Sequence, residues 1–286
     1  MQVHAHGLNP KDYSIRSGHL QWITGKRFPM QIGSDAAGVV EAVGEKVTHW
    51  KPGDRVFGYL NLYHGGAASE FCRFSEKAIA RIPEGVDYVT AAAIPCANLT
   101  ALQALRDWGR LKAQQRVLLI GARGGVGSAA IQIAKVLGAH VTAVSSSANV
   151  DYCYSLGADV ALSYQTDNPY APDLPYDLVL QVHGGRQPFY ERSRPVLKRR
   201  GRFVMLVPSP KALANIVLSR LLPWPRYYFF PVRARTRDLA LLGQWVTEGK
   251  LVPQVSKVYP YDQLVEAHRQ IDSAHTRGKL VLRVAD

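Results

Sequence analysis

A glycine-rich segment in the middle of the chain has the composition of a phosphate-binding loop. The segment RVLLIGARGGVGSAAIQIAKVLGAHVTAVSSS (116–147) runs from a short apolar strand through glycines into an amphipathic helix and then a second apolar strand. Backbone N–H groups at such a strand-to-helix turn approach a pyrophosphate without a Cβ in the way, and the helix N-terminus favours an anion. We therefore predict a dinucleotide site here; the alternative is a glycine-rich turn without a ligand.

The predicted contacts of this loop are Ala122, Arg123, Gly124, Gly125, Val126 and Gly127. Ala122 stands where the strict GxGxxG pattern has its first glycine, so the βαβ context supports the prediction more than the motif does. Arg123 either contacts the phosphates or is solvated.

The residues after the second strand of this unit select the dinucleotide. NAD sites usually place an Asp or Glu about 20 residues past the loop, where it accepts the ribose 2′-OH and repels a 2′-phosphate. Here the segment reads Ser145-Ser146-Ser147-Ala148-Asn149, and the first acid is Asp151. Hydroxyl groups donate to phosphate, although this segment contains no Lys or Arg. The sequence thus favours NADP(H), with NADH as the alternative.

Strands and helices alternate after Val89, which favours an α/β fold with a parallel, doubly wound sheet. Further strands of this sheet are expected at 159–164, 177–184, 202–208 and 227–232. Before Val89 the chain reads as short strands and turns, typical of a small antiparallel barrel or meander. The strands expected there are 39–47, 55–59, 69–75 and 78–83.

Three helices are expected outside the βαβ unit. Residues 89–109 are rich in Ala and Leu, with Thr90 as the cap and an interruption at Pro95. The other two helices, 236–250 and 261–273, precede a closing strand at 279–284. In the last helix His268 shares a face with Leu264, Val265 and Ile271, so we expect a packed histidine and not a ligand.

Composition excludes several protein classes. The chain has 286 residues, 47% of them hydrophobic, and its glycines and prolines are dispersed, which indicates a folded globular protein of one or two domains. No apolar run reaches the roughly 18 residues of a spanning helix, and the N-terminus lacks a signal sequence, so a cytoplasmic location is expected. The three scattered cysteines build neither a disulfide framework nor a zinc ribbon.

The formal charge of +13 is concentrated in one region. Thirteen Lys and Arg residues and a single acid, Glu191, lie between Arg186 and Arg237. Together with the nearby aromatic residues Trp224 and 227–230, this region allows a second hypothesis: a non-catalytic dinucleotide-binding protein that binds RNA, anionic lipid or a protein partner. The favoured interpretation is that YYFFPV (227–232) is an internal strand and KRRGR (198–202) a solvated turn, so nucleic acid is not the expected partner.

Motifs along nearly the whole chain resemble the medium-chain dehydrogenase/reductase superfamily, in its zinc-free quinone oxidoreductase (zeta-crystallin-like) branch. The matching segments are VHAHGLNPKDYSIRSG (3–18), IGSDAAGVVEAVGEKVTHWKPGDRVFG (32–58), AAIPCANLTALQAL (92–105), GARGGVGSAAIQIAKVLGA (121–139), SLGAD (155–159) and AHRQIDSAHTRGKLVL (267–282). The joint order of these segments makes the match specific.

The resemblance implies a Rossmann domain inserted into a GroES-like β-barrel catalytic domain. We expect the catalytic domain at 1–90 and 235–286 and the NADP-binding domain at 91–234. Relatives begin with further strands, so about thirty residues, enough for two or three strands, are expected to be absent before Met1. The expected consequence is an exposed strand edge and lowered stability.

The resemblance also bears on metal. Zinc alcohol dehydrogenases of this superfamily carry a Cys at the position of Asn9, a His-Glu pair at Ser34-Asp35 and a Cys at Cys96. Asn9 and Ser34 are poor zinc ligands, and the clustered cysteines of a structural zinc lobe are missing. No zinc and no metal ligands are therefore expected, and a zinc-type alcohol dehydrogenase is the less favoured alternative.

Without a Lewis acid, the implied chemistry is hydride transfer from NADPH to a small electrophile, a quinone or an α,β-unsaturated carbonyl. Asn9 resembles the family's active-site asparagine and is the candidate for binding a carbonyl oxygen; the alternative is a turn residue before Pro10. Tyr13 is the candidate proton donor, with a packed tyrosine as the alternative. Relatives that reduce enoyl thioesters place a tyrosine shortly after the RSG (16–18); here His19 and Leu20 follow, which disfavours that substrate.

Further cofactor contacts follow from the resemblance. Thr100 resembles a threonine near the nicotinamide, and Tyr164 a tyrosine that meets the 2′-phosphate; Asn149 stands where a lysine often accompanies that tyrosine. His183 and Val207, at the carboxyl ends of later strands, are expected to line the nicotinamide half. Relatives often form dimers through edge strands of this domain, which makes 227–232 a candidate homodimer interface.

Overall fold

The computed structural model describes residues 1–21, 25, 29–61, 65–171, 173–182, 189–207, 212–273 and 276–285. Backbone contacts divide the chain into two compact units: unit 1, Met1–Leu99 with Val232–Asp286, and unit 2, Thr100–Pro231. Unit 1 is therefore built from both ends of the chain, and unit 2 from its middle.

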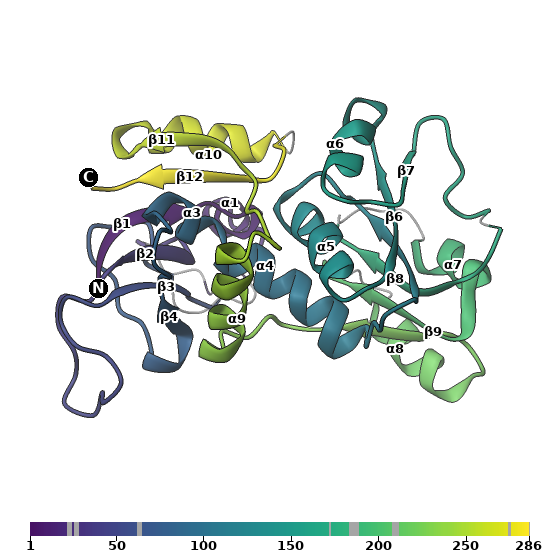
Figure 1. The fold of residues 1–286 in the computed structure, drawn as a ribbon, viewed down its shortest axis with the longest axis horizontal. Helices are drawn as coiled ribbons and strands as arrows, with labels where there is room; N and C mark the ends of the chain where they lie inside the picture. The colour runs from purple at the N-terminus through teal and green to yellow at the C-terminus, as the bar shows by residue number, and fades with distance from the viewer. Residues whose placement is uncertain are drawn as a thin grey trace. The chain divides into compact units, whose positions relative to one another are not determined.

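Unit 1 contains a six-stranded sheet in which the last strands of the chain pair with the first (Figure 1). Its order is β11-β12-β1-β2-β3-β4, and its pairings are antiparallel except for the parallel pair β11 and β12. The strands are β1 Gln2–Gly7, β2 Asp35–Val39, β3 Arg55–Tyr59, β4 Ile79–Arg81, β11 Val255–Pro260 and β12 Lys279–Arg283. Because β1 pairs with β12 on one side and β2 on the other, the first strand of the chain lies inside the sheet, whose edge strands are β4 and β11.

Unit 1 also contains short helices. They are α1 Pro10–Arg16, η1 Glu76–Ala78, α3 Tyr88–Ala93, α9 Thr236–Thr247, η5 Tyr261–Gln263 and α10 Leu264–Asp272, and α4 Pro95–Leu102 continues from unit 1 into unit 2. Helix α3 lies so close to β1 that a Cβ on Gly7 would stand 2.3 Å from the carbonyl oxygen of Ala92. This approach is possible because residues 91–93 are fully buried alanines. The cap of α3 is Asp87, whose carboxylate accepts hydrogen bonds from the backbone N–H and the hydroxyl of Thr90, so the prediction of Thr90 as the cap was wrong.

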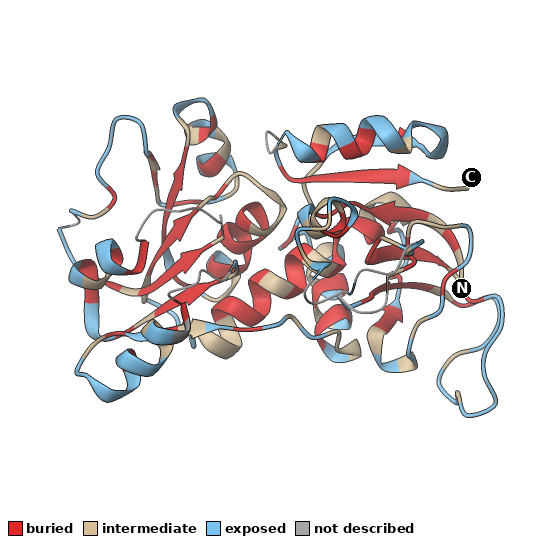
Figure 2. Ribbon diagram, turned by 180° about the vertical axis from the view of Figure 1, so that it is seen from behind, coloured by how far each residue is buried: buried red, intermediate tan, exposed pale blue. Residues whose placement is uncertain are grey.

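Unit 2 is a doubly wound α/β unit. Its sheet has the order β10-β9-β8-β5-β6-β7 with parallel pairings throughout, which is the Rossmann strand order, and the predicted fold class is confirmed. The strands are β5 Arg116–Ile120, β6 His140–Ser145, β7 Val160–Ser163, β8 Tyr176–Gln181, β9 Leu197–Met205 and β10 Arg226–Phe229. The helices are the π-helix η2 Gln103–Trp108, α5 Gly125–Val136, η3 Ser147–Asn149, α6 Val150–Ser155, α7 Phe189–Ser193, η4 Arg194–Val196 and α8 Ala212–Leu221. The central strands are almost entirely buried (Figure 2).

Two strand predictions in unit 1 differ from the structure, and one strand of this unit was not predicted. The strand expected at 39–47 was wrong: β2 ends at Val39, and residues 41–46 are exposed and form no strand. Of the strand expected at 69–75, only Phe71 forms an isolated bridge, to Gln2. Strand β11 was not predicted, because an edge strand with mostly exposed side chains lacks the apolar alternation that identifies a strand.

In α10, His268 and Ile271 are buried as expected, whereas Val265 is 55% exposed, so its predicted place on the packed face was wrong. Among the described residues, no helix combines the length and the apolar character needed to cross a membrane.

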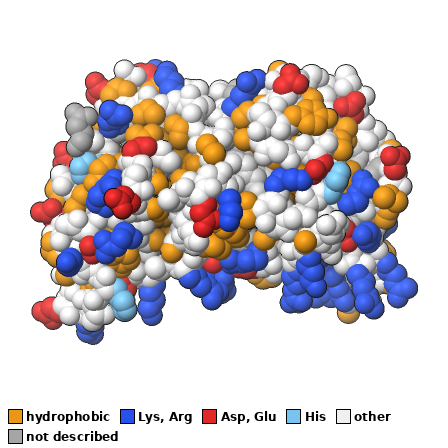
Figure 3. All heavy atoms as spheres, in the orientation of Figure 1, with side chains coloured by type: hydrophobic (Ala, Val, Ile, Leu, Met, Phe, Trp, Pro, Cys, Tyr) orange, Lys and Arg blue, Asp and Glu red, His pale blue; other side chains and the backbone are white. Residues whose placement is uncertain are grey.

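The basic region of unit 2 is largely structured. Residues 198–201 belong to β9 and not to a turn, with 198–200 exposed, and 226–229 form the edge strand β10, not an internal one. Lys and Arg side chains gather over β9 and α8 in the space-filling view (Figure 3). The aromatic rings Tyr227 and Phe230 are only 1% and 4% exposed. Both are packed in the fold and unavailable for stacking with bases, whereas Phe229 is 36% exposed. The segment therefore presents no continuous aromatic surface, and its burial does not favour nucleic-acid binding.

Candidate functional site

The glycine loop of unit 2 lies between the end of β5 and the start of α5. Gly124 is the N-cap of α5, with φ −74° and ψ 178°, an extended conformation open to any residue. A Cβ on Gly124 would meet no atom within 4 Å, whereas a Cβ on Gly127 would stand 2.3 Å from the carbonyl oxygen of Gly121 and 2.6 Å from the carbonyl carbon of Ala122. Gly127 is thus required by the packing of α5 on the loop. Gly124 is required by nothing in the chain itself, as expected where a ligand approaches the backbone.

The predicted ribose contacts lie together at one end of the sheet. Ser145 ends β6 beside Ser163 of β7, and the backbone N–H of Tyr164 donates to the carbonyl of Ser145 at 3.0 Å. The Asn149 amide donates to the hydroxyl of Ser146 at 2.6 Å. Tyr164 itself is 64% exposed. The structure therefore groups these four predicted residues, which come from two strand ends and the turn after β6.

The other predicted cofactor residues are less closely grouped. Arg123 and Val126 are half-buried in the loop and first turn of α5, and Thr100 is half-buried in α4. Val207 follows β9 and is 48% exposed. His183 lies outside the described residues.

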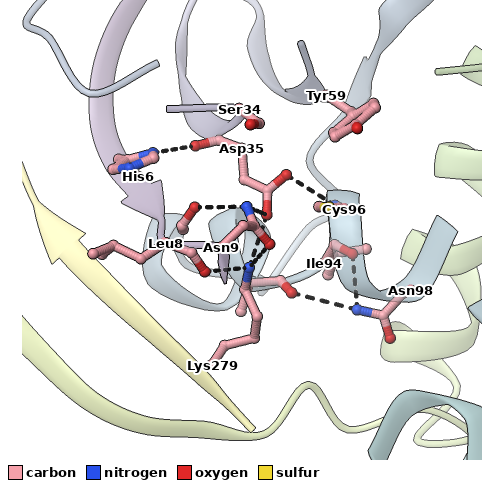
Figure 4. A network of polar contacts seen from close by, with 12 residues as sticks. His6, Leu8, Asn9, Ser34, Asp35, Tyr59, Ile94, Cys96, Asn98 and Lys279 are labelled. Carbon is pink, nitrogen blue, oxygen red and sulfur yellow. Dashed lines mark hydrogen bonds and ion pairs between the residues drawn. The ribbon is translucent and has the colours of Figure 1, made fainter. Parts of the chain in front are cut away.

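In unit 1, buried polar side chains converge on the ammonium of Lys279 (Figure 4). Its Nζ donates to Asn9 Oδ1 at 2.6 Å, to the backbone oxygen of Leu8 at 2.8 Å and to Asp35 Oδ2 at 2.9 Å. The side chains of Lys279 and Asp35 are 6% and 0% exposed. The other carboxylate oxygen of Asp35 accepts the backbone N–H of Cys96 at 2.9 Å. The result is a fully buried ion pair held by β12, β2 and the turn between β1 and α1.

Asn9, the predicted carbonyl-binding residue, lies at the centre of this network. Its amide nitrogen donates to Asp35 Oδ2 at 3.0 Å and to the carbonyl of Gly7 at 3.2 Å, so both amide N–H groups already have acceptors. Its backbone N–H donates to Asp12, which also accepts the hydroxyl of Ser34. To donate to a substrate carbonyl, Asn9 must give up one of these protein acceptors.

A second phenol, which the sequence did not single out, borders the network. Tyr59, at the end of β3, is 3% exposed, and its hydroxyl accepts a hydrogen bond from Lys11 Nζ at 2.8 Å. Burial, and then the neighbouring Cys96 and Asp35, raise the pKa of Tyr59 far above its usual value, and burial raises the pKa of Cys96 to about 11. Both groups therefore stay protonated at neutral pH.

Tyr13, the predicted proton donor, lies on α1 and packs away from the polar network. Its ring packs against the apolar cluster that includes Leu8 and Tyr259 and makes an edge contact with His19 at 6.0 Å between ring centroids. The structure thus places Tyr13 among apolar side chains, while Tyr59 lies beside the polar network. The sequence did not predict a role for three residues, Lys11, Tyr59 and Lys279. No motif marks Lys11 or Tyr59, and the only signal for Lys279 was its place at the start of the apolar strand 279–284.

Two buried histidines near this network make the stability of the fold depend on pH. Burial lowers the pKa of His6 and of His268. Because the carbonyl of Asp35 can only accept, His6 donates through Nδ1, at 2.8 Å. Within the described chain, His6 Nε2 and both ring nitrogens of His268 have no hydrogen-bond partner. Protonating either ring therefore places an uncompensated charge in the interior.

The free energy of unfolding is accordingly expected to be constant between about pH 7 and 8 and to fall as pH decreases through about 6.5, the pKa of an unfolded histidine, until the lower folded pKa is passed. The slope is at most about 1.4 kcal/mol per pH unit for each histidine. Urea denaturation at several pH values measures it. His268→Leu is expected to flatten the dependence, while the same substitution at the exposed His49 should not; equal effects at both positions would contradict the assignment.

Comparison with known proteins identifies the family. The chain matches the alcohol dehydrogenase GroES-like domain over residues 1–84 and the zinc-binding dehydrogenase family over residues 156–282. A chloroplast envelope quinone oxidoreductase homolog of Arabidopsis thaliana is 31% identical over 293 residues, which cover 99% of this chain and 88% of the relative. The chain belongs to the quinone oxidoreductase branch of the medium-chain dehydrogenase/reductase superfamily. The resemblance drawn from the sequence motifs is confirmed.

Two further relatives support this oxidoreductase assignment. The solved quinone oxidoreductase of Coxiella burnetii has a TM-score of 0.90 and 32% identity, covering 99% of this chain and 89% of that one. A mitochondrial NAD(P)H oxidoreductase of Bos taurus is 29% identical over 321 residues, covering 99% of this chain and 81% of the relative. This oxidoreductase therefore belongs to a family that uses a nicotinamide cofactor.

The family description also raises the question of zinc, which the residues of unit 1 do not fit. The described residues contain no group of three or more His, Cys, Asp and Glu side chains placed to hold a metal. At the positions that carry zinc ligands in the zinc enzymes, Asn9 offers an amide and Asp35 is bound by the ammonium of Lys279. A nicotinamide dinucleotide does fit unit 2, because the backbone at Gly124 is open and the first-turn N–H groups of α5 have no acceptor within the helix.

Proposed function

We propose that this oxidoreductase transfers hydride from NADPH to a quinone or an α,β-unsaturated carbonyl without zinc. The observation that carries the cofactor preference is the end of β6, where the segment 145–149 contains no carboxylate, Ser146 and Ser147 offer hydroxyl groups at least partly open to solvent, and the buried Asn149 donates to Ser146. Such a surface accepts a 2′-phosphate, which a carboxylate would repel. Bound in unit 2, the nicotinamide supplies the hydride.

The substrate class follows from what unit 1 can supply. A quinone or enone takes hydride at carbon or through conjugation, so the protein has only to orient it and to deliver a proton to oxygen or to the adjacent carbon. We propose Asn9 as a group that orients the carbonyl and Tyr59, hydrogen-bonded to Lys11, as the proton donor in place of the candidate Tyr13, whose ring packs against apolar side chains. The network around Lys279 holds Asn9 in one orientation for this role.

The cofactor proposal is tested by placing a carboxylate at the ribose end of the sheet. The purified protein is expected to oxidise NADPH in the presence of benzoquinones or enones, and Ser146→Asp is expected to raise the KM for NADPH about tenfold while changing the KM for NADH little. The control is Ser155→Asp, on the exposed side of α6. Absence of NADPH binding by the folded protein would refute the reductase function; an unchanged NADPH preference in Ser146→Asp would refute the ribose site.

The proton donor is tested by two matched phenol deletions. Tyr59→Phe is expected to lower kcat about 100-fold with little change in the affinity for NADPH, because general-acid groups contribute on this scale. Tyr13→Phe, on the neighbouring helix, is expected to change kcat by less than about threefold, since its ring serves packing. The reverse order of effects would restore Tyr13 as the donor.

A further inference from the structure

The ammonium of Lys279 makes the contacts of a bound cation. Its three N–H groups meet three oxygens, Leu8 O, Asn9 Oδ1 and Asp35 Oδ2, at 2.8, 2.6 and 2.9 Å. An ammonium has three donors and no acceptor, so this set satisfies it completely. The contacts also determine the orientation of the Asn9 side-chain amide. An ammonium can only donate, so the atom that faces Lys279 must be the oxygen, and the nitrogen then faces two acceptors, Asp35 Oδ2 and Gly7 O.

Lys279 supplies the positive charge that balances the carboxylate of Asp35, while the second buried carboxylate, Asp12, is held by the backbone N–H of Asn9 and the hydroxyl of Ser34. Asp35 is 0% exposed, and its carboxylate is neutralised by Lys279, whose side chain is 6% exposed. A divalent cation added beside the ammonium would leave a net positive charge in the interior, which is strongly unfavourable without further anionic ligands.

We propose that Lys279 is a built-in cation at the place where zinc enzymes of the superfamily carry their metal ligands. It neutralises Asp35, orients Asn9 and excludes divalent metal from the site. Removing the side chain leaves a cavity lined by one carboxylate and two neutral oxygens, a set that suits a small cation with N–H donors or a hard metal ion. The inference deepens the zinc-free part of the proposed function. Its tests measure metal content and thermal stability and not enzyme activity. The proposal about Lys279 can therefore be refuted while the reductase function is supported, and the reductase function can be refuted while the proposal about Lys279 is supported.

The first test uses the unmodified protein. After expression in zinc-supplemented medium and dialysis, the metal content of the wild type, measured by mass spectrometry, is expected to be far below one equivalent of zinc. One equivalent of zinc that is retained by the wild type and lost in Asp35→Asn would overturn the proposal.

The second test adds a small cation that can occupy the cavity left by the Lys279→Ala substitution. In Lys279→Ala, about 100 mM methylammonium chloride is expected to raise Tm by about 3 °C relative to the same concentration of tetramethylammonium chloride, which has equal charge but no N–H group. Lys279→Met, whose side chain fills the same space, and the wild type are expected to show no such difference. Equal responses of Lys279→Ala and Lys279→Met to methylammonium would overturn the proposal, and the metal content of the wild type decides it if neither variant folds.

Discussion

Replacing Lys279 by methionine is expected to lower the free energy of unfolding by about 3–5 kcal/mol, because it leaves the carboxylate of Asp35 buried without its counter-charge. Asn9 and the backbone of Cys96 still donate to Asp35, but neither carries a positive charge. Part of the effect also comes from the oxygens of Leu8 and Asn9, which lose the donor that they share. Urea denaturation followed by circular dichroism measures the change.

A double-mutant cycle separates the ion pair from general packing. In Lys279→Met/Asp35→Asn the buried charge is gone, so the double variant is expected to be destabilised by clearly less than the sum of the two single variants. Lys198→Met is the matched control: Lys198 also pairs with an aspartate, Asp177, but its side chain is 48% exposed, and its loss is expected to cost about 1 kcal/mol or less. Additive single effects at 279 and 35 would show that the pair is not coupled.

Gly127→Ala is expected to destabilise unit 2 by about 2–3 kcal/mol and to weaken NADPH binding more than tenfold. The added Cβ would lie 2.3–2.7 Å from backbone atoms of Gly121 and Ala122, so α5 must move away from the loop. The better helix propensity of alanine, worth about 1 kcal/mol, offsets only part of this cost. Thermal unfolding and a fluorescence titration with NADPH measure the two effects.

Gly124→Ala is the control for this prediction, because its Cβ meets no atom within 4 Å. Its stability is expected to stay within about 0.5 kcal/mol of the wild type. Its affinity for NADPH is expected to fall, since the added methyl group occupies the side from which the pyrophosphate approaches. Loss of stability at Gly124, or unchanged NADPH affinity in both variants, would contradict the assignment of this loop.

The sequence predicted those parts of the molecule whose conformation depends on residues close together in the chain. The glycine loop combines an apolar strand, a turn and an amphipathic helix within a few residues, so β5, α5 and β6 were located correctly. Parallel strands carry their carboxyl ends to one edge, which is why Ser145 and Tyr164, predicted separately, lie together. Strand β11 and the end of β2 were misjudged because, at sheet edges and exposed turns, pairing and not composition decides the conformation.

By itself, the sequence determined the family, the doubly wound sheet and the position of the glycine loop, because backbone sterics at glycines and the period of apolar residues act over short distances. Only the tertiary structure decided the polar centre of unit 1. Lys279 is 244 residues from Asp35 and 270 from Asn9, and the three meet because β12 and β2 pair on opposite sides of β1. A buried charge needs an opposite charge next to it in the folded protein, whatever the distance along the chain. The residues around Lys279 in the sequence therefore do not identify Asp35 as its partner.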